Sequence, residues 1–265
     1  MASQPDILAA HLLRVPVHRA LIRALEHRLF ARETLFHPVL DVGCGDGHFA
    51  ALAFPGRIDV GIDVVGALVA EAGRNGPYER VEVVSGTDLP YEDGTFRTVV
   101  SNCAVEHVPE VEALVREVAR VLTPGGRFIF SVMNDRFTGL LFTVRTLRRM
   151  GLSGLAGQYG RWWNRRAAHH HLDSPEIWRE RLARHGLTVE AATSYLSLEA
   201  TRAFELAHYY YAIPALLWHG LTGRWSMRGS SVRSSLAYRW LKPYSDEPWP
   251  SVGSCTFIAA HKQAP

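Results

Sequence analysis

Residues 39–49 read VLDVGCGDGHF, a short apolar run that breaks into three alternating glycines and then enters a helical pattern. Glycine at positions 43 and 45 offers no Cβ to collide with a bound ligand, and Gly47 lets the following helix pack close to the strand. Such a loop brings backbone close to a ligand, although a glycine-rich turn that merely joins strand to helix fits as well. The stretch therefore predicts a strand, a loop and a helix in succession.

The chain around this loop alternates short apolar runs with helical stretches, which is the pattern of a parallel sheet. We expect strands at 38–42, 58–62, 81–84, 96–101, 126–132, 187–194 and 255–261, and the clearest helices at 109–122 and 175–185. The sequence thus predicts an α/β fold: a Rossmann-like, seven-stranded, mostly parallel sheet with helices on both faces.

The same pattern predicts one domain, 1–265, with four parts. Apolar residues at helical spacing indicate an N-terminal helical lid at 1–36, followed by a cofactor-binding core at 37–133. Two helical or irregular insertions follow, 134–172 after the fifth strand and 199–250 between the sixth and seventh strands. We expect both insertions on the substrate side.

Composition is that of an ordinary globular protein, with 47% hydrophobic and 21% charged residues. A net charge of +3 is too small to indicate nucleic-acid binding by itself. The three cysteines form no Cys-x-x-Cys pair, so neither zinc nor a disulfide framework is indicated. The N-terminus lacks the pattern of a signal peptide. We therefore expect a cytoplasmic protein, which can also contact a membrane surface peripherally.

Two acids follow the next strands. Asp63 ends the second strand, 20 residues after Gly43, where a carboxylate can accept both hydroxyls of a ribose. Asp88 follows the third strand, where it can accept from an adenine amino group. Each acid alone also fits a solvated turn, since Asp favours turns. Together with the glycine loop they favour a nucleoside ligand.

These residues resemble the class I S-adenosylmethionine-dependent methyltransferase family over positions 37–132, where SNCAVEHV at 101–108 and LTPGGR at 122–127 continue the resemblance. The resemblance implies that Asp41 and the three glycines surround the methionine moiety, Asp63 holds the ribose, and Asp88 with Leu89 holds the adenine. The full set it implies for S-adenosyl-L-methionine, with S-adenosyl-L-homocysteine as product, is Arg19, Asp41, Gly43, Cys44, Gly45, Gly47, Asp63, Val64, Asp88, Leu89, Asn102 and His107.

A nicotinamide-dependent dehydrogenase is the alternative, because Gly45, Gly47 and Ala50 fit a G-x-G-x-x-A fingerprint. His48 replaces the glycine of the better-centred frame. That alternative also leaves Asp88 and the Pro-Gly-Gly turn at 124–126 unexplained, so we rank it lower.

Methyl transfer is an in-line displacement that depends mostly on positioning, so few catalytic residues are required. His107 follows the fourth strand and is our candidate general base, although it equally fits a residue that packs on the cofactor or caps a helix. On the N-terminal helix, which carries His18 and Arg19, the Arg19 cation can meet the methionine carboxylate. The alternative for Arg19 is a solvated helix face.

A histidine triplet, residues 169–171, precedes Asp173. Adjacent side chains diverge and no Cys pair or i, i+4 His pair accompanies them, so we predict no metal site. His170 is instead a candidate substrate residue, as are Tyr209 and Tyr210 in the apolar stretch 203–218, which we interpret as a surface helix or pocket wall.

The insertions indicate the acceptor. Arginines alternate with apolar and aromatic residues in 134–172, which suits a small lipophilic acceptor such as a specialised metabolite or an isoprenoid-like molecule. Three alternatives stay open: a lipid-linked or anionic acceptor at a membrane surface, base stacking on nucleic acid, which we disfavour, and a cofactor-binding regulatory or scaffold protein without turnover. The sequence does not predict the oligomeric state.

Overall fold

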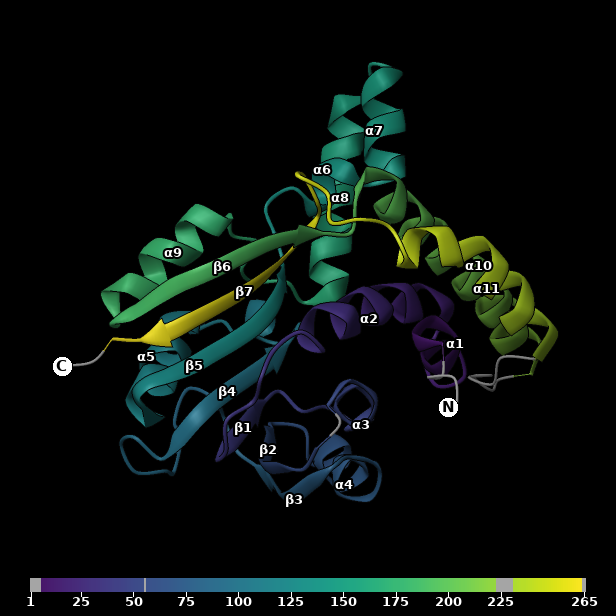
Figure 1. Cartoon of the computed structure of the whole chain (residues 1–265). Helices are drawn as coiled ribbons and strands as arrows, with labels where there is room; N and C mark the ends of the chain where they lie inside the picture. The colour runs from purple at the N-terminus through teal and green to yellow at the C-terminus, as the bar shows by residue number, and fades with distance from the viewer. Residues whose placement is uncertain (1–5, 55, 223–230, 264–265) are drawn as a thin grey trace.

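The computed structural model describes residues 6–54, 56–222 and 231–263 of the chain. Its centre is a seven-stranded sheet in the order β3-β2-β1-β4-β5-β7-β6 (Figure 1). The strands are β1 Val39–Val42, β2 Ile58–Asp63, β3 Tyr78–Val83, β4 Phe96–Asn102, β5 Leu122–Met133, β6 Leu187–Tyr195 and β7 Cys255–Lys262. The first five strands pair in parallel, and β7 runs antiparallel to both β5 and β6. The predicted mostly parallel α/β fold is confirmed.

Two strands begin earlier than the sequence pattern predicts. β3 starts at Tyr78 rather than near 81, because Tyr78 and Arg80 already pair with β2 although this edge strand is polar there. β5 starts at Leu122 rather than 126, because Leu122 pairs with Phe96 across a register irregularity. A hydrophobicity pattern does not reveal the start of a strand that lies at the sheet edge or that pairs irregularly.

Helices cover both faces of the sheet. They are α1 Ile7–Leu12, α2 Val17–Phe30, α3 His48–Ala53, α4 Gly66–Asn75, α5 Val111–Val121, α6 Phe137–Leu140, α7 Phe142–Arg149, α8 Ser153–Ala167, α9 Pro175–Arg184, α10 Leu198–Thr222 and α11 Ser231–Ser245, with a short 3₁₀ helix at Val105–His107. Helices α5 and α9 share one buried cluster with Leu40 and Phe128. Helices α2 and α3 share a second buried cluster with Val39 and Ile129. These two residues are next to Leu40 and Phe128 in the strands, so they face the opposite side of the sheet.

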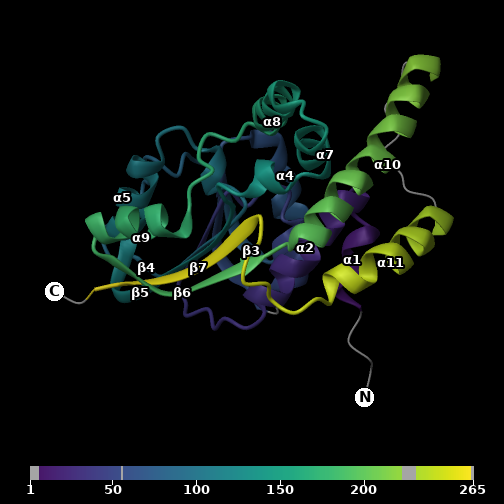
Figure 2. The same cartoon turned by 90° about the horizontal axis from the view of Figure 1, so that it is seen from above.

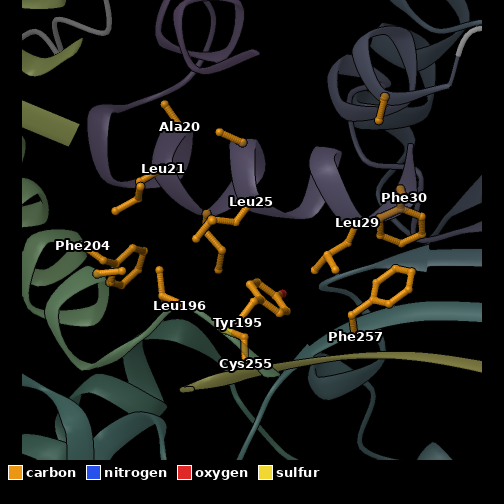
Figure 3. Close-up of a cluster of buried hydrophobic side chains, with 14 of the residues drawn as sticks. Ala20, Leu21, Leu25, Leu29, Phe30, Tyr195, Leu196, Phe204, Cys255 and Phe257 are labelled. Atoms are coloured by element: carbon orange, nitrogen blue, oxygen red, sulfur yellow. The ribbon is translucent and has the colours of Figure 1, made fainter. Parts of the chain in front are cut away.

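Helix α2 is anchored on the sheet by its apolar face. Leu21, Leu25 and Leu29 recur every four residues and are buried, and they pack toward Tyr195 and Phe257 of the last two strands (Figure 3). Burying each leucine stabilises the fold by about 1.5–3 kcal/mol. The same anchoring holds the polar edge of α2 against the loop that follows β1.

The insertions are helical. Residues 134–172 form α6, α7 and α8, and α10 and α11 form a second pair that extends away from the sheet (Figure 2). Helix α10 continues through Pro214. Residues 223–230 of the expected 199–250 insertion lie outside the described residues. Within the described part of the chain, no helix is both long and apolar enough to cross a membrane.

Candidate functional site

The loop after β1 adopts a backbone that requires glycine. Gly43, Gly45 and Gly47 have φ values of +78°, +56° and +74°, in the left-handed region that other residues rarely adopt. Backbone N–H groups of Gly43 and Cys44 donate to the carbonyl of Ile62 in β2, at 2.8 and 2.9 Å. The loop is therefore folded tightly against the end of the sheet.

The three glycines serve different purposes, and the expected reasons for two of them are wrong. A Cβ on Gly43 would lie 2.4 Å from the Cβ of Ala104, so this glycine makes room for protein rather than for a ligand. A Cβ on Gly47 would lie 2.9 Å from the Cα of Ala72, so the close approach is to α4 rather than to the strand. A Cβ on Gly45 would meet no protein atom within 4 Å. Only Gly45 faces open space.

A cavity of about 150 Å³ lies between this loop and helix α2. Six residues expected at the cofactor site line it: Arg19, Asp41, Gly43, Cys44, Gly45 and Asn102. The seven others that line it were not expected there: Val15, Arg23, Asp46, His48, Phe49, Ala50 and Leu68. The signal for Arg23 was available, because it stands one helical turn after Arg19 and shares its face.

Asp41 is a buried acid at the base of the cavity. Its Oδ2 accepts a hydrogen bond of 2.6 Å from the Tyr78 hydroxyl. This partner was not expected, because the sequence pattern predicted that β3 starts only at residue 81. The pKa of Asp41 is raised to about 7, chiefly by burial; the bond from Tyr78 opposes the rise and the nearby Asp63 adds to it. Asp41 therefore changes charge near neutral pH.

Asp63 ties the glycine loop to the end of β2. Its two carboxylate oxygens accept from the backbone N–H of Gly45 at 3.1 Å and of Val65 at 2.9 Å. Each oxygen retains a second lone pair that can accept from a ligand hydroxyl. Val64, beside it, is 67% exposed, so this edge of the site is open to solvent.

Two arginines of α2 bring positive charge to the cavity. Arg23 forms a 2.6 Å salt bridge with Glu26, which is fully buried and also accepts from the Tyr195 hydroxyl at 2.9 Å and from the Cys103 thiol at 2.8 Å. The Arg23 guanidinium is thus already paired with Glu26. Arg19 forms no salt bridge with a described residue, which leaves its guanidinium to a ligand.

Asn102 carries an unused hydrogen-bond donor. Its Oδ1 accepts from the Ser131 hydroxyl at 2.7 Å, which fixes the orientation of the amide. Its Nδ2 is buried, and among the described residues it has no hydrogen-bond partner. Because a buried amide N–H without a partner is costly, this side chain of the cavity wall fits a ligand that supplies an acceptor.

The remaining residues expected at the cofactor site lie outside the cavity. Leu89 is buried, with its backbone N–H bonded to Glu117 Oε2 at 3.0 Å, and Asp88 is exposed just beyond β3. His107 is exposed; its Nδ1 lies 3.1 Å from the carbonyl oxygen of Ala168, and its ring stacks on that of His169 with centroids 5.3 Å apart. His107 therefore joins the end of β4 to the first insertion.

The expected substrate residues are not brought to the cavity. His170 is exposed, and its backbone N–H donates to the carbonyl of Glu106 at 2.9 Å. Tyr209 packs with Tyr159 and the buried Glu205, and Tyr210, on the same helix α10, is 43% exposed. Across the described residues, no group of three His, Cys, Asp or Glu side chains is arranged to hold a metal ion.

A parallel sheet whose first strand ends in a glycine loop, beside an acid that ends the second strand, defines a Rossmann-like domain for a nucleoside cofactor. Residues 40–130 match the family model described as a methyltransferase domain. Over these residues the chain is thus similar to a methyltransferase domain, in agreement with the class I S-adenosylmethionine-dependent methyltransferase fold that the sheet and the glycine loop indicate. The dehydrogenase alternative is set aside.

The similar proteins are named for different methyl acceptors. A demethylmenaquinone methyltransferase of Symbiobacterium thermophilum is 35% identical over 117 residues, 39% of this chain and 46% of that protein. A ubiquinone biosynthesis O-methyltransferase of Coxiella burnetii is 30% identical over 111 residues, 40% of this chain and 47% of that protein. The matches therefore span just under half of each relative. The geranyl diphosphate C-methyltransferase of Streptomyces coelicolor A3(2) shares the fold, with a TM-score of 0.53 at 17% identity over 93% of this chain and 84% of that one.

Proposed function

We propose that this protein binds S-adenosylmethionine at the cavity beside the glycine loop and transfers its methyl group to a small lipophilic acceptor. The observation that carries the proposal is the cavity wall itself. It combines a loop glycine open to a ligand, a buried acid, an uncommitted cation and an amide donor without a partner, contributed by Gly45, Asp41, Arg19 and Asn102.

Each group of the wall suits one part of the cofactor. Arg19 meets the methionine carboxylate, and Asp41, once ionised, meets the ammonium group. Asp63 accepts from the ribose hydroxyls with the lone pairs that the loop leaves free. Asp88 and Leu89 extend this edge of the sheet toward the adenine. The bound cofactor supplies an electrophilic methyl group on a sulfonium sulfur.

The chief contribution of the chain to catalysis is to position the acceptor against the methyl group. Holding the acceptor atom about 3–3.5 Å from the methyl carbon, in line with the breaking bond, replaces a bimolecular encounter. His107 is the candidate base for a hydroxyl or amine acceptor. If its Nδ1–H donates to the Ala168 carbonyl, its Nε2 carries the lone pair that receives the acceptor proton.

A belt of rings supports a lipophilic acceptor. The ring of His18 on α2 lies 5.6 Å from that of Phe204 and 4.8 Å from that of His208, both on α10. The His208 ring lies 5.0 Å from that of Trp163 on α8, and the Trp163 ring lies 6.1 Å from that of Phe137. Relatives named for menaquinone and ubiquinone, and a neighbour named for geranyl diphosphate, agree with an apolar acceptor of this kind.

The test is methyl transfer itself. The protein is incubated with isotopically methyl-labelled S-adenosylmethionine and an organic-solvent extract of cells, and labelled products are found by mass spectrometry. We expect label in an extractable apolar product, absent with the Asp63→Ala variant. Cofactor binding without label in any fraction would favour the regulatory or scaffold alternative, and label in polar products alone would contradict the lipophilic acceptor.

A further inference from the structure

The first insertion is strongly basic, and Asp135 is the one acid within its 134–172 range. Residues 136–172 contain seven arginines and no aspartate or glutamate. The arginines are Arg136, Arg145, Arg148, Arg149, Arg161, Arg165 and Arg166. None of the seven forms a salt bridge with a carboxylate in the part of the chain that the structure describes. This positive charge is therefore not used to hold the fold together.

The helices α7 and α8, residues 142–167, which we call the α7–α8 hairpin, also expose large apolar side chains. Met150 is 65% exposed, Leu152 41% and Leu155 51%, all at or beside the turn between the helices. Trp162, seven residues after Leu155 and so on the same helix face, is 42% exposed. Exposed apolar groups gathered in one place mark an interaction surface.

The apolar and basic groups lie together on the exposed surface of the hairpin. Ala156, Gly160 and Trp163 form the buried face of α8, which packs toward α6 and α7. Outside this buried face α8 exposes Leu155, Trp162 and its three arginines, Arg161, Arg165 and Arg166, while Arg148 and Arg149 immediately precede Met150 at the turn. An apolar tip with arginines beside it is thus directed away from the protein.

Figure 1 shows the hairpin rising from one end of the sheet, clear of the strands. The segment that leaves α8 returns to the site, because His169 stacks on His107 and the backbone N–H groups of His170 and His171 bond to Glu106. Helix α8 therefore connects the exposed turn of the hairpin, at its N-terminal end, to the end of β4, at its C-terminal end, about 22 Å away along the helix.

We propose that the α7–α8 hairpin docks on an anionic lipid bilayer. The guanidinium groups attract lipid phosphates, and the aliphatic tip enters the boundary between headgroups and acyl chains. Nucleic acid would satisfy the arginines but offers no acyl layer to Met150, Leu152 and Leu155. The inference stands apart from methyl transfer, since a lipid surface could recruit the chain whatever its acceptor.

The test is co-sedimentation of the full chain with vesicles of phosphatidylcholine alone and of phosphatidylcholine mixed with phosphatidylglycerol. We expect binding to the anionic vesicles only. Arg148→Ser combined with Arg149→Ser should weaken binding about thirtyfold, at about 1 kcal/mol per arginine. Met150→Ser combined with Leu152→Ser should weaken it about tenfold or more, because the tip loses its apolar insertion.

Helix α9, which packs on β6, offers a matched control. Its Ile177 is 44% exposed and its Arg179 is half exposed, so Ile177→Ser and Arg179→Ser remove the same kinds of group elsewhere. Both control variants should bind vesicles like the unmodified chain. Retained helical circular dichroism and cofactor affinity in the hairpin variants would show that a loss of vesicle binding is not a loss of folding.

A second readout reports insertion directly. Leu152→Cys, labelled with a polarity-sensitive dye, should shift its emission to the blue on anionic vesicles, whereas labelled Ile177→Cys should not. Equal binding to neutral vesicles, or hairpin variants that bind like the unmodified chain, would overturn the proposal. So would tight binding to single-stranded RNA that is lost with the arginines but insensitive to Met150 and Leu152.

Discussion

At the scale of single residues, Asp41 links the site to pH. Its pKa near 7 means that the buried carboxyl is mostly neutral below that pH and mostly ionised above it. Because the cofactor brings an ammonium group, affinity for S-adenosylmethionine should rise as the pH increases through about 7. Calorimetric titrations across this range should show the rise, and Asp41→Asn should flatten it. An equal pH slope in both proteins would contradict this role of Asp41.

Substitutions at two loop glycines distinguish an effect on folding stability from an effect on cofactor binding. Gly47→Ala forces a Cβ within 2.9 Å of the α4 backbone at a φ of +74°, so it should lower the free energy of unfolding by about 2–4 kcal/mol. Gly45→Ala has room and should cost only about 1–2 kcal/mol of strain, yet weaken cofactor affinity strongly. Urea unfolding and calorimetry on both variants measure the two effects. The reverse ranking in stability would show that the loop packs differently.

The glycine positions and the acids Asp41 and Asp63 could be predicted from the sequence, because a strand, a glycine loop and an acid are local signals. Their partners could not. Tyr78 reaches Asp41 only because β3 pairs beside β2, and the collision of a Gly43 side chain with Ala104 depends on where the chain returns after β4.

At the scale of elements, α2 depends on one buried acid. Arg23→Met would leave Glu26 buried without its cation, which should lower the free energy of unfolding by about 3–5 kcal/mol. Arg19→Met removes a cation that is exposed and outside any described salt bridge, so it should leave stability nearly unchanged while weakening cofactor binding. Equal stability losses in thermal or urea unfolding would argue against this division of roles.

Three histidines join α1, α2 and α3. His11 lies buried between His48, 3.2 Å from its Nδ1, and His27, 3.4 Å from its Nε2. Burial, aided by the neighbouring His48 and His27, lowers the pKa of His11 to about 3 from 6.5. A lowered histidine pKa stabilises the fold fully above pH 6.5, and this stability is lost as the pH falls toward 3. The free energy of unfolding should therefore decline below pH 6.5, and less steeply for His11→Phe. A steeper decline in that variant would contradict the assignment.

The helices of the first insertion were harder to predict than those of the core. α6 and α7 are only four and eight residues long, and α8 contains three glycines, so no long apolar period marks them. They are held by contacts distant in sequence, such as the 2.7 Å bond from the Tyr159 hydroxyl to Glu205 of α10.

At the scale of the whole molecule, the sequence defines the sheet better than what surrounds it. Strands of the parallel core can be predicted from local apolar runs, whereas the placement of the N-terminal helices and the insertions depends on pairs such as Glu26 with Tyr195, 169 residues apart. The same limit applies to the proposed acceptor site, because the ring contacts on which the proposal rests join α2, α8 and α10.

The central claim is that the glycine loop and Asp63 bind the nucleoside of S-adenosylmethionine. Titration calorimetry of the unmodified chain and of Asp63→Ala, with S-adenosylmethionine and with NAD in parallel, tests it directly. The account predicts saturable binding of S-adenosylmethionine, weakened by about 1–3 kcal/mol in the variant, and no binding of NAD. Binding of NAD in its place, or an affinity for S-adenosylmethionine that Asp63→Ala leaves unchanged, would contradict it.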